Sequence, residues 1–210
     1  MLNILCKVSV FVILSATVAV SQAADVQTLY RQWADIRYQQ QSEEREGMFG
    51  SLREEAEHLT EAHPENAELW IWRGIINSTY AGEVGGLSAL SVIKEAKENL
   101  ETALELDAGA LNGSAYTSLG VLYYQVPGWP LSFGDDSEAE EFLKKGLAIN
   151  PKGIDSNFFY ADFLINQGRK KEARGYLDIA ENASDRSDRP VADKGRRAEI
   201  AGLKARLMEK

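Results

Sequence analysis

The chain has 210 residues, a formal net charge of −9 and a single cysteine, Cys6. The acidic balance argues against nucleic acid as a partner, because phosphate backbones attract basic surfaces. One cysteine cannot form an internal disulfide, so the fold has to rely on a hydrophobic core, for which this length is ample.

The first 24 residues are typical of a secretory signal peptide. They contain no acidic residue and one basic residue, Lys7, and residues 8–20 are almost wholly apolar. Small residues follow at the positions that a signal peptidase reads, which predicts cleavage after Ala23 or Ala24. The apolar run is short for a membrane-spanning helix, although an uncleaved anchor is the alternative. We expect residues 1–23 to be a signal peptide and the mature protein to be periplasmic or secreted.

Two helices are predicted at the start of the mature chain, over residues 25–40 and 47–62. Their apolar residues recur at helical spacing, and Pro64 ends the second helix because proline cannot extend it. The apolar residues concerned are Leu29, Trp33, Ile36, Met48, Leu52, Ala56 and Leu59. We interpret the pair as a degenerate first repeat, since terminal repeats are commonly atypical.

Three clearer helical hairpins are predicted over residues 66–107, 113–151 and 154–183. Small residues recur in both helices of each hairpin, and a glycine or alanine allows two backbones to approach where helices cross. We expect six structural positions at these crossings: Gly74, Ala96, Gly120, Ala139, Ala161 and Ala173. Four larger residues are interpreted as core packing: Trp70, Tyr116, Tyr123 and Leu143.

The last predicted helix covers residues 190–208. Ile200, Leu203 and Leu207 share one face of it, and basic residues, Arg196 among them, lie elsewhere. A solenoid needs a terminal element with a polar outer side, so we interpret this helix as a C-terminal cap.

The spacing resembles that of tetratricopeptide (TPR) repeats, because Ala139 and Ala173 lie 34 residues apart. The expected fold is an all-α, TPR-like α-solenoid of about four helical hairpins with a C-terminal capping helix, forming a single domain over residues 24–210. Stacked helix pairs create a concave face, which favours holding a partner over transforming one.

Two insertions interrupt the repeat. Gly74 and Ala96 are 22 residues apart and Gly120 and Ala139 are 19 apart, where a plain repeat has 12. Such insertions commonly map to loops on the binding side of a solenoid. We expect loops around residues 80–86 and 127–134, in which large rings either plug the hairpin or contact a partner. The candidate ligand- or partner-binding residues are Tyr80, Tyr124, Trp129 and Phe133.

The second insertion carries a family resemblance. Residues 122–136, LYYQVPGWPLSFGDD, lead to residues 157–164, NFFYADFL, and this stretch resembles exported TPR proteins of the TRAP-transporter T-component family. The resemblance covers about residues 65–183. It implies a periplasmic, all-helical, non-catalytic accessory protein. Its implied partners are a solute-binding protein or a small apolar ligand, together with copies of itself in a ring.

Catalysis and metal binding find little support in the sequence. His58 and His63 are five residues apart, which does not place them on one helix face, and no phosphate loop or nucleophile motif is present. We interpret Asp135 as a helix N-cap paired with Glu138, and not as a metal ligand. We therefore expect no cofactor, no metal and no enzymatic activity.

Charge is unevenly distributed along the chain. Residues 25–143 contain 7 basic and 22 acidic residues, whereas residues 144–210 contain 15 and 10. Solvated helix faces account for most of this pattern. The alternative is head-to-tail self-association or steering of a charged partner.

Two functions therefore compete: an accessory component of TRAP-type uptake and a general protein-interaction scaffold of the cell envelope. An apolar tunnel lined by Tyr80, Trp129 and Phe133 would favour the first, and a wide polar concave face would favour the second. A closed pocket with converging titratable groups would instead indicate an enzyme.

Overall fold

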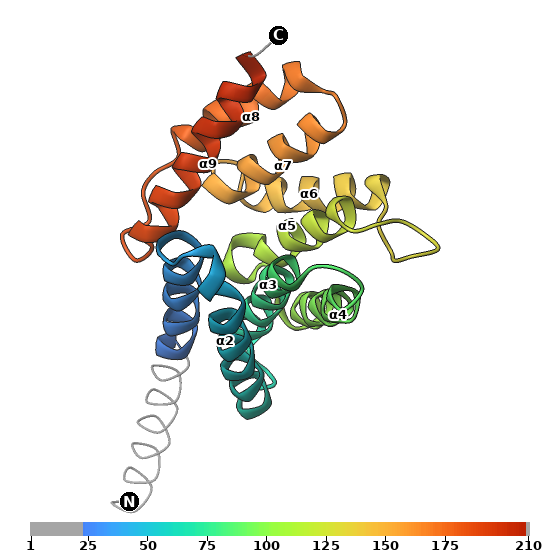
Figure 1. The fold of residues 1–210 in the computed structure, drawn as a ribbon. Coiled ribbons are helices and arrows are strands. Elements are labelled where there is room, and N and C mark those ends of the chain that lie inside the picture. The colour runs from blue at the N-terminus through green and yellow to red at the C-terminus, as the bar shows by residue number, and fades with distance from the viewer. Residues whose placement is uncertain (1–22, 209–210) are drawn as a thin grey trace, which may run out of the picture.

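The computed structural model describes residues 23–208, and within them the chain is helical almost throughout. Antiparallel helix pairs stack one on the next into a TPR-like α-solenoid, which confirms the expected fold class (Figure 1). The expected signal peptide lies outside the described residues apart from Ala23. Among the described residues, no helix is both long and apolar enough to cross a bilayer.

Residues 23–39 are helical and pair with α2. The later hairpins are α3 with α4, α5 with α6, and α7 with α8, and α9 closes the chain. The bounds are α2 Ser42–Ala62, α3 Ala67–Val84, α4 Ala89–Asp107, α5 Ala110–Gln125, α6 Asp136–Ile149, α7 Ile154–Asn166, α8 Lys170–Glu181 and α9 Pro190–Met208.

Small residues lie where the helices of each hairpin cross, as predicted. A Cβ at Gly74 would lie 2.6 Å from Leu100, and one at Gly120 would lie 2.6 Å from Leu143. The four alanines of the predicted set (Ala96, Ala139, Ala161 and Ala173) have no exposed surface at all. A larger side chain at these crossings would force the two helices apart.

Side-chain caps set two of the helix starts. The Asn66 side chain accepts hydrogen bonds from the first backbone N–H groups of α3. Asp135 accepts from the backbone N–H groups of Ser137 and Glu138, at 2.8 and 3.0 Å, which confirms its interpretation as an N-cap. Both caps satisfy amide donors that have no partner inside the helix.

The prediction of a loop around residues 80–86 is wrong. Helix α3 continues to Val84, so Tyr80 lies on a regular helix and only residues 85–88 connect α3 to α4. The extra residues lengthen the two helices of this hairpin, because Gly82 is accommodated inside α3 and the turn begins only at Gly85 and Gly86, both at positive φ. Helix α2 also begins five residues earlier than predicted, at Ser42.

The second predicted loop exists and is tightly closed. The backbone N–H of Gly134 donates to the Pro127 carbonyl at 3.0 Å, and that of Asp135 donates to the Tyr123 carbonyl at 2.9 Å. A Cβ at Gly134 would lie 1.9 Å from the Val126 carbonyl oxygen, so only glycine fits there. The loop is therefore a fixed protrusion between α5 and α6 (Figure 1).

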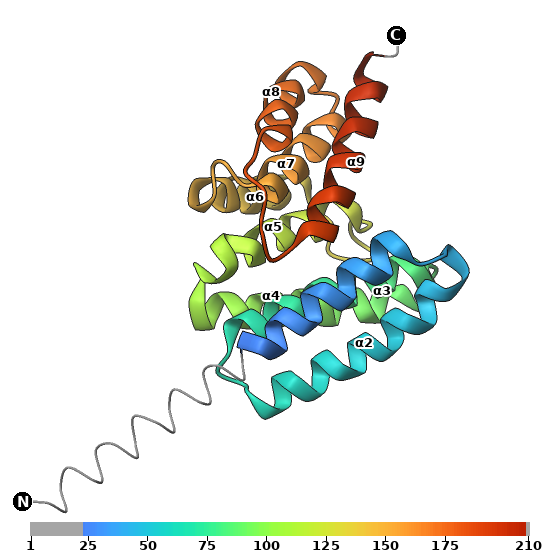
Figure 2. The ribbon, with the colours of Figure 1, turned by 90° about the vertical axis from the view of Figure 1, so that its left-hand side faces the viewer.

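Helix α9 both caps the solenoid and returns to its beginning. Ile200, Leu203 and Leu207 pack on α7 and α8, as predicted. The first turns of α9 and the linker before it lie beside the helix of residues 23–39 (Figure 2). The prediction that Arg196 lies on the polar side of α9 is wrong: it is 8% exposed, because it is ion-paired inside the concave face.

Candidate partner-binding groove

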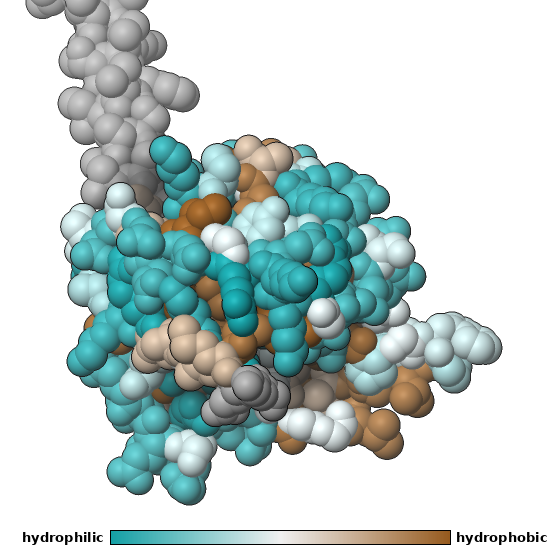
Figure 3. Space-filling view, turned by 90° about the horizontal axis from the view of Figure 1, so that it is seen from above, coloured by the Kyte–Doolittle hydropathy of each residue, from teal (hydrophilic) through white to brown (hydrophobic). Residues whose placement is uncertain are grey.

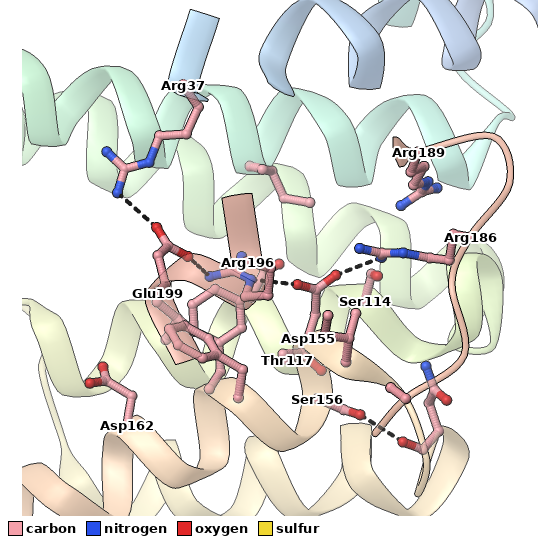
Figure 4. Close-up of a pocket in the computed structure, with 18 of the residues that line it drawn as sticks. Arg37, Ser114, Thr117, Asp155, Ser156, Asp162, Arg186, Arg189, Arg196 and Glu199 are labelled. Atoms are coloured by element: carbon pink, nitrogen blue, oxygen red, sulfur yellow. Dashed lines mark hydrogen bonds and ion pairs between the residues drawn. The ribbon is translucent and has the colours of Figure 1, made fainter. Parts of the chain in front are cut away.

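The concave side of the solenoid holds a groove of about 1800 Å³. Its walls come from the first helix of each hairpin: residues 23–39, α3, α5 and α7. Helix α9 and the linker of residues 182–189 form most of the remaining wall (Figure 4), and residues 45, 150–152, 178 and 179 complete it. The groove exists because the first helices line the inside of the curve while their partners lie outside.

Short hydroxyl side chains line much of the groove. Ser78 and Thr79 lie on α3, and Ser114, Thr117 and Ser118 lie on α5. A left-handed turn at Leu111, Asn112 and Gly113 precedes the regular part of α5 and adds backbone to the same wall. Small side chains leave space and offer hydrogen bonds, which suits a polar or polypeptide ligand.

Aromatic rings line the N-terminal end of the groove. Trp33 and Tyr38 meet edge to face with ring centroids 5.9 Å apart, and Trp33 lies at the same distance from Trp72. The indole nitrogen of Trp33 donates to the Thr79 hydroxyl at 2.9 Å. This end of the groove therefore combines apolar area with hydroxyl groups.

An ion-pair network braces the opposite wall, with Asp155 at its centre. Asp155 accepts from Arg186 at 2.7 Å and from Arg196 at 2.8 Å (Figure 4). Burial by itself would raise the pKa of Asp155, but Arg196 and Arg186 outweigh it and lower that pKa to about 2. Asp155 thus stays charged at neutral pH and holds α7 to the linker through Arg186 and to α9 through Arg196.

Arg196 is held by rings as well as by carboxylates. Its guanidinium carbon lies 4.3 Å from the Phe158 ring centroid and 4.5 Å from that of Phe159. Burial would lower the pKa of Arg196, but Asp155 and other neighbours raise it, so the side chain stays protonated. It also donates to Glu199 at 2.6 Å, which extends the network along α9.

Glu199 carries the network across to the first helix. It accepts from Arg37 at 3.4 Å and from the Tyr38 hydroxyl at 3.2 Å. Burial is the main reason that the pKa of Tyr38 rises to about 12, so this phenol stays neutral and donates. The charged groups of this wall pair with one another, which is the arrangement of a structural brace.

The four candidate residues named from the sequence do not line the groove. Tyr80 packs in the N-terminal core beside Gly50 and Arg53. Tyr124 donates to Asp162 at 2.8 Å, and burial raises its pKa well above the usual value. They therefore form no common apolar tunnel.

The two rings of the second insertion have different environments. Phe133 packs edge to face on Tyr123, 5.3 Å between centroids, and lies under the Lys97 ammonium group. Trp129 at the loop tip is 90% exposed. One ring therefore plugs the hairpin, and the other is available to a partner.

The residues that line the groove were not predicted as binding residues, because the two insertions were expected to carry the binding surface. A usable signal was present: Ser114 and Ser118 lie four residues apart on α5, so they share one helix face, and both are partly exposed in the groove. Among the described residues, no cluster of three or more histidine, cysteine or acidic side chains has the geometry to hold a metal ion.

Comparison with known proteins gives no assignment of family or function. No family model matches the chain, and no curated protein matches it. One solved structure, titled "Functional Characterization of Pseudomonas Aeruginosa pilF", is similar over 90% of this chain and 94% of that chain, with 14% identity and a TM-score of 0.36. A TM-score this low does not indicate a shared function.

Proposed function

We propose that this protein is a non-catalytic interaction scaffold that holds a segment of a partner protein in its concave groove. The observation that carries the proposal is the groove itself, which is open to solvent and walled by short polar side chains and a few aromatic rings. Polypeptide segments suit such a surface, since they supply backbone hydrogen-bonding groups along their whole length.

The character of the groove favours a protein partner over a small apolar ligand. The tunnel expected for an apolar ligand needed Tyr80, Trp129 and Phe133 in one lining, and these residues lie apart. The outer surface seen from above is mostly hydrophilic, with apolar residues showing between the polar ones (Figure 3). A general protein-interaction scaffold is therefore the better supported of the two functions, and its place in the cell envelope remains part of the proposal.

A role in TRAP-type uptake is the second candidate. The resemblance of residues 122–164 to T-component proteins motivates it, and the exposed Trp129 on its fixed loop offers a surface for a solute-binding protein. Export to the periplasm belongs to the same proposal and rests on the composition of residues 1–23. Sequencing the N-terminus of the protein purified from periplasmic extract tests the export and the cleavage together.

Site-specific photo-crosslinking in the native cells tests which surface holds the partner. The photoreactive residue p-benzoylphenylalanine replaces Ser118 in the groove, Trp129 at the loop tip, or Glu141 on the exposed side of α6 as a matched control. Adducts with a defined protein from position 118, and none from 141, are expected. Adducts from 129 alone would move the binding surface to the loop and favour the TRAP candidate. Equal adducts from 118 and 141, or none from 118 and 129, would contradict the scaffold proposal.

A further inference from the structure

Arg189 ends the linker between α8 and α9 and lines the groove at its aromatic end. Its guanidinium carbon lies 4.4 Å from the ring centroid of Tyr30 and 5.5 Å from that of Trp72. The side chain is only 17% exposed. The Arg189 guanidinium therefore packs on two aromatic rings and is largely shielded from water.

The donors of Arg189 are poorly matched by acceptors. Its ion-pair partner among the residues that the structure describes is Asp188, whose oxygen lies 3.6 Å from Nε, which is too long for a hydrogen bond. That same oxygen of Asp188 already accepts from the Tyr30 hydroxyl at 2.9 Å. Within the described residues, no hydrogen bond involves the Arg189 guanidinium, and the long contact with Asp188 is its ion pair.

Two neighbouring arginines of the groove, Arg186 and Arg196, differ from Arg189 because their guanidinium groups bond carboxylates. Arg186 bonds Asp155 and Asp193, and Arg196 bonds Asp155 and Glu199. Stacking on rings stabilises the charge of Arg189 but leaves its N–H groups, which lie in the guanidinium plane, without acceptors. None of its nitrogens is both buried and unpaired, so these free N–H groups face the open groove, where an acceptor from a ligand can reach them.

A second donor in the same aromatic cluster also lacks an acceptor. The indole nitrogen of Trp72 is buried without a hydrogen-bond partner, in a residue that is 6% exposed. Lys152 and Arg206 line the same groove as exposed cations. Two donor side chains of the aromatic cluster therefore lack acceptors, and further cations lie along the same groove.

We propose that Arg189 is the anchor for a carboxylate of the partner segment, so that the groove selects partners with an aspartate or glutamate side chain. This inference rests on the proposed function and specifies the chemistry of the partner. A carboxylate supplies two acceptor oxygens in the planar arrangement that a guanidinium matches. The surrounding rings exclude water from the pair and strengthen it.

Selection from a random-peptide library displayed on phage tests the proposal, since it requires no identified partner. Peptides are selected on the purified protein, and those that lose binding to the Ser118→Trp variant, which places a large ring in the groove, are retained as groove binders. Acidic residues should be enriched at one or more positions of these binders. Replacing the enriched acid by its amide in a synthetic peptide should weaken binding by about tenfold.

Two variants then assign the effect to one arginine. Arg189→Met should weaken binding of the acidic peptide by about tenfold and leave the affinity for the amide peptide unchanged. Arg206→Met removes the same charge from an exposed position in the same groove and should not change the affinity for either peptide. Should Arg189→Met fail to fold, Arg189→Lys, which keeps the charge but not the planar fork, replaces it and should also weaken the acidic peptide.

The outcomes separate this inference from the proposed function. Groove binders without enrichment of acids, or with equal affinity for wild type and the Arg189 variants, would overturn the anchor and leave the scaffold standing. A library that yields no groove binder would overturn both.

Discussion

The hydroxyl of Tyr38 donates a hydrogen bond of 3.2 Å to Glu199, which lies 161 residues further along the chain. The contact joins the first described helix to α9, and Gly195 lies against the Tyr38 ring one turn earlier on α9. Together they connect the two ends of the solenoid across its concave side. The width of the groove therefore depends on this junction, because it fixes the curvature of the hairpins between its ends.

Gly195→Ala should open the junction. The new Cβ would lie 2.4 Å from atoms of the Tyr38 ring, so the ring has to move, and the free energy of unfolding should fall by about 1–3 kcal/mol. Gly202→Ala in the same helix has free space around its Cβ and should raise that free energy by up to about 1 kcal/mol. Urea denaturation of both variants measures the difference, and equal shifts would argue against the tight contact.

Asp155→Asn should destabilise the wall of the groove. The change leaves Arg186 and Arg196 without their shared carboxylate. We expect a loss of about 1–2 kcal/mol, less than for a fully buried pair because a third of the side chain is exposed. Asp178→Asn, which breaks an exposed pair with Lys204, is the control and should change stability by less than about 0.5 kcal/mol. Similar losses for both variants would show that the network is not a brace.

Stability should fall in acid between about pH 5 and pH 2. Hydrogen bonds from Arg169, Lys144 and Tyr160 lower the pKa of Glu140 from 4.5 to about 2, and the arginines lower that of Asp155 from 3.8 to about 2. In this range the unfolded chain binds more protons than the folded one, so the stability present above pH 5 is lost as the pH falls through both folded-state values. Urea midpoints measured from pH 7 to pH 2.5 check this, and the slope should be shallower in Asp155→Asn. A flat profile would contradict the assigned pKa shifts.

The two rings of the loop at residues 127–134 should respond differently to removal. Phe133→Ala deletes contacts with Tyr123 and Lys97 and should lower the unfolding free energy by about 1–3 kcal/mol. Trp129→Ala removes an exposed ring and should change it by less than about 0.5 kcal/mol. Thermal melting followed by circular dichroism compares them. A large loss for Trp129→Ala would place its ring in the core and remove the loop as a partner surface.

Much of the fold follows from local pattern. The spacing of Ala96, Leu100 and Ala103 predicts one buried helix face, and all three have no exposed surface. The cap at Asp135 is predictable because an N-cap depends only on the residues beside it. The prediction for Tyr80 is wrong because the glycines after it resemble a loop, whereas packing against the first hairpin keeps that stretch helical.

The sequence by itself determined that helices form, where most of them begin and end, and that small residues let them pair, because these properties depend on neighbours within a few turns. Only the tertiary structure decided that α9 returns to the first helix and that Arg196 is buried against Asp155. It also decided that Arg189 lies in the groove without a hydrogen-bond acceptor. Those contacts join residues brought together by the accumulated curvature of four hairpins. A small rotation at each helix crossing sets that curvature, and no local pattern encodes it.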